Sequence, residues 1–139
     1  MRARHAAAVV VALAMMRPIG AVAGPPAIDY ALNCQGCHLA DGAGTAGSVP
    51  ALAGSVAKFL GVPGGREFLV RVPGVAQSTL DDADLAEVLN WLLARFDGEH
   101  LPADFKPYSA EEVGPLRRSP LTNVARVRSE LLERGAPRP

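Results

Sequence analysis

Both cysteines of this 139-residue chain lie in one pentapeptide, Cys34-Gln35-Gly36-Cys37-His38. Two thiols at this spacing could form a disulfide, act as a redox dithiol or bind a metal ion. A structural zinc site needs four ligands, and the chain has no second cysteine pair to complete one. A redox dithiol of this type would follow a strand, whereas residues 29–33 before the motif predict a short helix. The residue after the second cysteine therefore decides the chemistry.

An imidazole directly after the second thiol indicates covalent attachment of a haem. In Cys-x-x-Cys-His each thiol can add to one haem vinyl group, and the imidazole reaches the iron from the same side. We predict one covalently attached haem c, with thioether bonds to Cys34 and Cys37 and with His38 as the proximal ligand of its iron. A bound haem would also complete the core of a chain in which only 5% of the residues are aromatic.

The residues after the motif resemble the small class I cytochrome c family. A glycine-rich loop at 42–47 precedes Ser48-Val49-Pro50-Ala51-Leu52-Ala53-Gly54, which is similar to the Pro-x-Leu-x-Gly segment of that family. The resemblance implies that the Pro50 carbonyl accepts a hydrogen bond from His38 and that Leu52 presses on the haem. An ordinary surface turn is the alternative. The resemblance covers roughly residues 26–97 and implies a mainly α fold, a small class I cytochrome c-like helical haem domain.

The sixth iron ligand is where the sequence departs from that family. The family places a methionine, often followed by proline, just before its C-terminal helix. Here the corresponding segment, 68–75, contains Val72-Pro73 and no methionine. All three methionines of the chain lie within its first 16 residues: Met1, Met15 and Met16. A His/Met haem built from residues after the first 23 is therefore excluded.

Several replacements for that methionine remain open. His100 is the tentative distal ligand, because it is the one histidine besides His38 after residue 23. An open or water-bound position, Lys58, another side chain and a ligand supplied by a partner protein are the alternatives. The choice matters because bis-histidine ligation lowers the haem potential relative to methionine ligation, whereas an open position permits small-ligand binding.

The strongest helix signal spans residues 81–96. Asp81 is the predicted N-cap, Leu80 and Leu85 can form a hydrophobic staple across the helix start, and Gly98 would close the helix in the left-handed region. One apolar stripe has the spacing of a helix face: Leu85, Val88, Leu89, Leu92, Leu93 and Phe96. This pattern predicts an amphipathic helix that packs on the core.

The resemblance implies that this helix crosses the helix that leads into the cysteine motif. Ile28, Tyr30 and Leu32 would supply the other side of the crossing. Trp91 lies off the main stripe, so it would either flank the haem edge or close the core.

The first 23 residues have the layout of a secretory signal peptide. Arg2, Arg4 and His5 form a basic start, an uncharged run follows from 6 to 16, and Ala21-Val22-Ala23 matches a cleavage site. A retained membrane anchor is the alternative, but the run is shorter than the roughly 20 residues that a bilayer requires. We therefore predict cleavage after Ala23, no membrane span thereafter, and a periplasmic or otherwise exported protein.

Residues 101–139 form a C-terminal extension beyond the haem domain at 24–100. A capping box at 109–112 would start a short helix that Gly114-Pro115 stops, and Ser119 with Pro120 would start a second helix. The second helix would have an apolar face formed by Leu121, Val124, Val127 and Leu131. Four arginines in this second helix and in the segment before it are expected on the surface: Arg117, Arg118, Arg126 and Arg128. The extension is either a helical strap on the haem domain or a docking arm for a partner.

Charge and composition narrow the function. The whole chain has 14 basic and 14 acidic residues, which argues against a nucleic-acid-binding protein. After removal of 1–23, residues 24–100 have a net charge of −5 and the extension has +2. We predict a carrier of single electrons between exported redox proteins, not an enzyme, with a periplasmic dehydrogenase, an oxidase or another cytochrome as partner. The alternative is a haem sensor, a small-ligand-binding protein or a minor peroxidase with an open sixth position.

Overall fold

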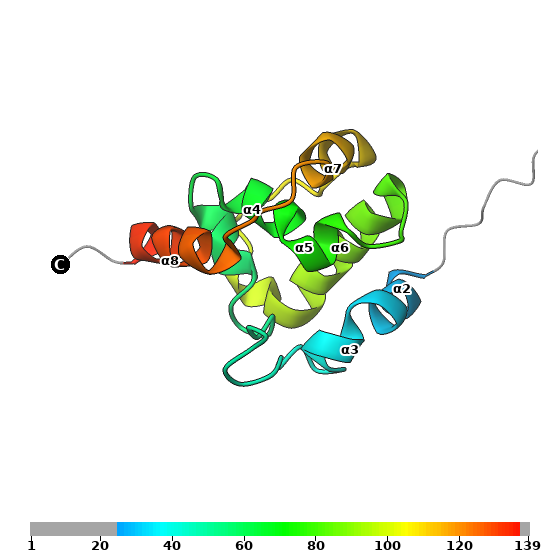
Figure 1. Cartoon of the computed structure of the whole chain (residues 1–139), viewed down its shortest axis with the longest axis horizontal. Coiled ribbons are helices and arrows are strands. Elements are labelled where there is room, and N and C mark those ends of the chain that lie inside the picture. Colours follow the sequence, from blue (N-terminus) through cyan, green and yellow to red (C-terminus); the bar gives the residue numbers. More distant parts are fainter. Residues whose placement is uncertain (1–24, 137–139) are drawn as a thin grey trace, which may run out of the picture.

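The computed structural model describes residues 25–136, and this part of the chain is mainly helical, as predicted (Figure 1). Within these residues no strand forms, apart from a single bridge between Thr45 and Val49. The elements follow in this order: α2 (Pro26–Asn33), α3 (Gln35–His38), η1 (Ala57–Gly61), α4 (Gly65–Arg71), α5 (Pro73–Ala76), α6 (Asp82–Asp97), η2 (Gly98–His100), α7 (Ala110–Arg117) and α8 (Val124–Gly135). The predicted signal peptide lies outside the described residues.

Helix α6 forms the centre of the fold. The Asp81 carboxylate caps it by accepting hydrogen bonds from the backbone N–H groups of Ala83 and Asp84, both at 2.9 Å, as predicted. All six residues of the predicted apolar stripe are buried. The left-handed cap at Gly98 is wrong: Gly98 has φ −57° and ψ −28°, because the chain continues in the right-handed region into η2.

Helix α2 crosses α6 through one aromatic side chain, not through the three side chains that were predicted. Tyr30 is 2% exposed, and its ring centroid lies 5.1 Å from that of Phe96 and 5.3 Å from that of Trp91. Ile28 and Leu32 are 53% and 78% exposed, so their predicted burial is wrong. With 3.6 residues per turn, positions two apart from Tyr30 point to the opposite side of α2. Trp91 packs against the core, which favours the second of its two interpretations.

The C-terminal extension packs on the rest of the molecule. Tyr108, Val113 and Leu131 belong to the same buried cluster as the α6 stripe. The Ser109 hydroxyl caps α7 by accepting from the Glu112 N–H, as predicted. The predicted stop at Gly114-Pro115 is wrong, and α7 continues to Arg117. A proline inside a helix costs one backbone hydrogen bond, and here burial of Val113 and several Arg117 hydrogen bonds offset that loss.

Helix α8 begins later than the sequence suggested. Asn123, not Ser119, is the N-cap, and its side chain accepts from the Arg126 N–H at 3.2 Å. The segment between α7 and α8 instead forms hydrogen bonds with Arg71 of α4. The Arg71 Nε donates to the Ser119 carbonyl at 2.7 Å, and the Leu121 N–H donates to the Arg71 carbonyl at 2.9 Å. The predicted apolar face is confirmed, with Leu131 fully buried. No helix among residues 25–136 is long and apolar enough to cross a membrane.

Candidate functional site

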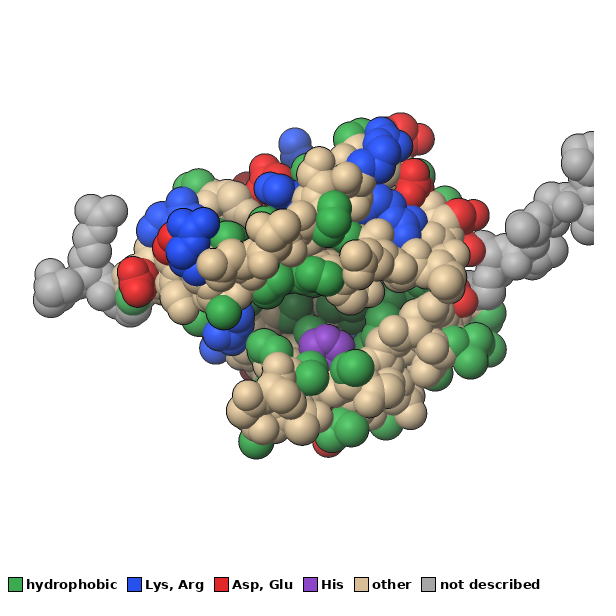
Figure 2. All heavy atoms as spheres, in the orientation of Figure 1, with side chains coloured by type: hydrophobic (Ala, Val, Ile, Leu, Met, Phe, Trp, Pro, Cys, Tyr) green, Lys and Arg blue, Asp and Glu red, His purple; other side chains and the backbone are tan. Residues whose placement is uncertain are grey.

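A cleft of about 340 Å³ opens on one face of the molecule, within the range of small-molecule and cofactor sites. In Figure 2 hydrophobic side chains line this hollow, and a histidine lies within it. The residues that line the cleft come from almost every element: Asn33, Cys34, Cys37, His38, Ser48, Val49, Pro50, Ala51, Leu52, Val56, Phe59, Phe68, Leu69, Val72, Pro73, Gly74, Val75, Leu89, Leu92, Val124 and Arg128. The structure therefore brings the two thiols and the imidazole of the predicted motif, with Pro50 and Leu52, to one apolar site.

The two thiols reach the cleft from a single helical turn. The Cys34 carbonyl accepts hydrogen bonds from the Cys37 N–H at 3.2 Å and the His38 N–H at 3.0 Å, which places all three side chains along the same edge. Both cysteines are free thiols. Burial raises the pKa of the Cys34 thiol, whereas the reactive thiol of a redox dithiol has a lowered pKa. Among residues 25–136, no group of three or more His, Cys, Asp or Glu side chains is arranged to hold a metal ion.

His38 is oriented by the loop that follows it. Its Nδ1 is buried without a hydrogen bond of standard geometry, so the bond to the Pro50 carbonyl that the resemblance implied is not formed here. Burial lowers the pKa of the imidazole, while the Pro50 backbone acts in the opposite direction. The Gly44 N–H donates to the His38 carbonyl at 3.1 Å. Gly44 has φ +70°, and a Cβ there would run into the carbonyls of Val49 and Pro50. Only glycine allows the chain to fold back this closely and bring Pro50 beside the imidazole.

The loop is tied to α6 at a second glycine. Gly42 has φ +73°, and a Cβ at this position would lie 2.8 Å from the Phe96 ring. The Gly42 carbonyl accepts from the Leu52 N–H at 2.7 Å, which turns Leu52 toward the cleft. The close contacts at Gly42 and Gly44 thus tie this loop to α6 and to the segment at 49–50.

The wall formed by α4, α5 and the residue between them is apolar. Phe68 and Leu69 of α4 and residues 72–75 contribute to it, so Val72-Pro73 does lie at the cleft. Within the described part of the chain, the cleft-lining residues include no methionine, no lysine and no histidine other than His38.

The structure does not bring His100 or Lys58 to the cleft. His100 Nδ1 lies 2.5 Å from Asp97 Oδ1, and the other oxygen of this buried carboxylate accepts from the Ala57 N–H at 2.7 Å. His100 therefore helps to join the end of α6 to the start of η1. Lys58 is exposed on η1.

The extension contributes to the cleft, which was not predicted from the sequence. Val124 and Arg128 of α8 both line it, and the Arg128 guanidinium lies 5.8 Å from the centre of the Phe59 ring. The expectation that Arg128 decorates the outer surface is wrong, as is that for Arg117, whose side chain is 13% exposed. The spacing could have revealed Arg128, because it lies four residues after Val124 and hence on the same helix face.

The donor set and the cleft fit a covalently attached haem. Two free thiols and an imidazole lie at one edge of an apolar cleft, with a buried imidazole nitrogen beside the Pro50 backbone. A second nitrogen of the same ring remains for iron. The fold and this site define a small helical haem protein of the c type.

Comparison with known proteins gives the family. No model of a known protein family matches the sequence. Two curated relatives, a cytochrome c-552 of Thermus thermophilus and the cytochrome c-552 of one particular strain of that species, are each 37% identical to the chain over 108 residues. These matches cover 65% of this chain and 82% and 73% of the relatives. The chain belongs to the family of small c-type cytochromes, electron-transfer proteins that carry covalently bound haem c.

Proposed function

We propose that this protein carries single electrons between exported redox proteins, with its haem bound through Cys34 and Cys37 and ligated by His38. The observation that supports this most strongly is that all three side chains line one apolar cleft. The haem supplies one-electron redox chemistry when it is bound. The chain's own residues attach it, orient the imidazole through the loop at 42–52, and exclude water with the apolar walls.

Charge supports the choice of partner. The net charge of −5 on residues 24–100 favours a redox partner with a basic rim, such as a periplasmic dehydrogenase that donates electrons. An oxidase or another cytochrome would accept them. Electron-transfer encounters are small and weakly held, so opposite charges mainly raise the association rate. Export is supported by the signal-peptide pattern of residues 1–23.

The test is the rate of electron transfer from a basic donor cytochrome at increasing ionic strength. We expect the rate to fall as salt screens the attraction. A rate that is independent of salt would contradict the electrostatic part of the proposal. Failure of the purified protein to cycle between oxidised and reduced forms would contradict electron transfer itself.

A second function, binding of a small ligand at an open sixth position, is favoured by one observation. The cleft-lining residues in the described part of the chain contain no second histidine, methionine or lysine. Spectra of the oxidised and reduced protein with and without carbon monoxide test it. Immediate binding to the reduced form supports an open position, whereas resistance to carbon monoxide contradicts it.

A further inference from the structure

We infer that Arg117, at the end of α7, is a positioning residue for one wall of the cleft and controls how fast a small exogenous ligand reaches the haem. The wall is the segment at 72–80, called the distal segment here, which contains α5 and the turn into α6. This inference rests on the proposed attachment of haem in the cleft. It assigns a role to the extension, the part of the chain that the family resemblance does not cover.

The distal segment has little structure of its own. Helix α5 has only four residues, far fewer than the roughly 12–15 at which an isolated helix becomes marginally stable. After α5 the chain passes through residues 77–81 without regular structure before α6 begins. Because residues 72–75 line the cleft, any movement of this segment would change access to it.

One guanidinium group holds this segment from outside. Arg117 Nε donates to the Ala76 carbonyl at 3.2 Å, Nη2 to the Ser78 carbonyl at 2.5 Å and Nη1 to the Leu80 carbonyl at 2.7 Å. Nη1 also lies 3.1 Å from Asp82 Oδ1, at the start of α6. Four bonds thus connect the extension to the whole turn that follows α5.

The chemistry of the side chain suits this task. The guanidinium is planar and rigid and offers five N–H donors, so it can satisfy several carbonyls at once, which a lysine ammonium on a flexible stem does poorly. The Arg117 side chain is only 13% exposed, so water competes little for these bonds. Gly114 lets α7 lie close to the start of α6, because a Cβ at this position would collide with the Asp82 carboxylate.

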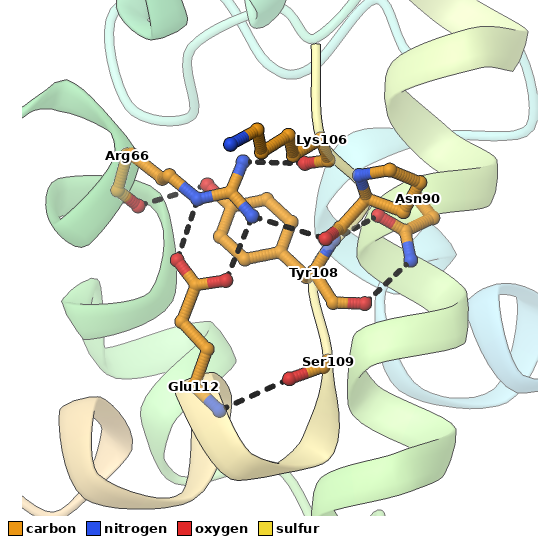
Figure 3. Close-up of polar contacts among 7 residues, drawn as sticks. Arg66, Asn90, Lys106, Tyr108, Ser109 and Glu112 are labelled. Atoms are coloured by element: carbon orange, nitrogen blue, oxygen red, sulfur yellow. Dashed lines mark hydrogen bonds and ion pairs between the residues drawn. The ribbon is translucent and has the colours of Figure 1, made fainter.

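A second arginine, on α4, also joins the haem domain to the extension, and its set of bonds, called the Arg66 clamp here, provides a matched control (Figure 3). Arg66 of α4 pairs with the Glu112 carboxylate and donates to the carbonyls of Lys106 at 2.7 Å and Pro107 at 3.2 Å. Its guanidinium carbon also lies 4.0 Å from the centre of the Tyr108 ring. This clamp ties the same extension to the haem domain without a hydrogen bond to the distal segment. Its loss should lower global stability but leave the distal segment held.

The experiment compares the haem-loaded variants Arg117→Gln, Arg117→Lys and Arg66→Gln with the unchanged protein. The measurement is the association rate of carbon monoxide with the reduced form, with the urea midpoint recorded for each variant. We expect Arg117→Gln to bind carbon monoxide about tenfold faster, since local opening of the distal segment becomes more frequent. Arg117→Lys should act in the same direction, because it keeps the charge but not the planar fork. Arg66→Gln should stay within about twofold of the unchanged protein even if its urea midpoint falls as far.

Two results would overturn the inference: no acceleration in Arg117→Gln, or equal acceleration in Arg66→Gln. If the unchanged protein resists carbon monoxide and Arg117→Gln binds it, this result would support the inference even more strongly. A haem stain on a denaturing gel separates failure of this inference from failure of the proposed function. Absence of covalent haem from the unchanged protein refutes both, whereas its presence in all variants with equal rates refutes only the role of Arg117.

Discussion

The two walls of the cleft are built in different ways. The wall at 34–52 carries the thiols and the imidazole, and its own sequence holds it through short-range hydrogen bonds and three glycines with positive φ. The wall at 68–80 is apolar, and Arg117, which is 37 to 41 residues away in the sequence from the carbonyls that it binds there, holds part of it. The first wall carries the residues proposed to attach the haem, and the second is held in part by the extension. Reactivity and access can therefore be changed separately.

The largest expected effect is at the first wall. Cys34→Ala combined with Cys37→Ala should abolish covalent haem attachment, because no thiol remains to add to a vinyl group. Each single change should weaken attachment, since one thioether can still form. A denaturing gel stained for haem measures both, with the single variants as controls. Covalent haem in the double variant would show that this wall does not carry the attachment chemistry.

A smaller loss of stability is expected at the loop that orients His38. Gly44→Ala should destabilise the protein by about 3 kcal/mol, because positive φ and a collision with two carbonyls act together. Gly47→Ala is the matched control: Gly47 also has positive φ, but a Cβ there would contact nothing within 4 Å. Its cost should be about 1 kcal/mol. Urea unfolding measures both, and equal losses would mean that the close approach to Pro50 contributes nothing.

Two buried tyrosines give one test at the first wall and one on α4, outside the second wall. The Tyr30 hydroxyl donates to the Leu39 carbonyl at 2.7 Å beside the motif, and the Tyr108 hydroxyl donates to the Arg66 carbonyl at 2.8 Å on α4. Burial raises the pKa of both, so both remain neutral donors. Each change to Phe should cost about 1 kcal/mol in unfolding free energy. Only Tyr30→Phe should also shift the haem spectrum, because Leu39 directly follows His38; a shift with Tyr108→Phe instead would reverse the assignment.

The smallest effect is expected at His100. Because His100 pairs with Asp97 and does not line the cleft, His100→Ala should leave the haem spectrum and carbon monoxide binding unchanged. The unchanged protein should lack the long-wavelength band of methionine-ligated ferric haem. A shift toward a high-spin spectrum in His100→Ala, with new binding of carbon monoxide, would make His100 the sixth ligand.

Local signals in the sequence predicted the first wall and α6 well. The cysteine motif, the Asp81 cap and the apolar stripe each depend on residues within a few turns, so their spacing carries the information. The predicted face of α2 was wrong because Ile28, Tyr30 and Leu32 are spaced by two, and residues spaced by two do not share one face of a helix.

The second wall was harder to predict because its determinants are distant in sequence. Pro115 predicted the end of a helix, yet the bonds that Arg117 makes with residues 76–82 help α7 to continue past it. Nothing near Arg117 in the sequence distinguishes it from the exposed Arg118 beside it. Only the folded structure shows which of the two is enclosed.

The position of α8 along the cleft has a consequence for the order of assembly. Val124 and Arg128 line the cleft from the helix that comes last among the described elements, whereas the attachment motif consists of α3 and the residue before it. A chain that emerges from its N-terminal end therefore presents the thiols while the side later closed by α8 is still open. If haem attaches while this side is open, docking of α8 would close the cleft over it. In that order of events, the helix that forms part of the cleft wall would also be the last element to enclose the haem.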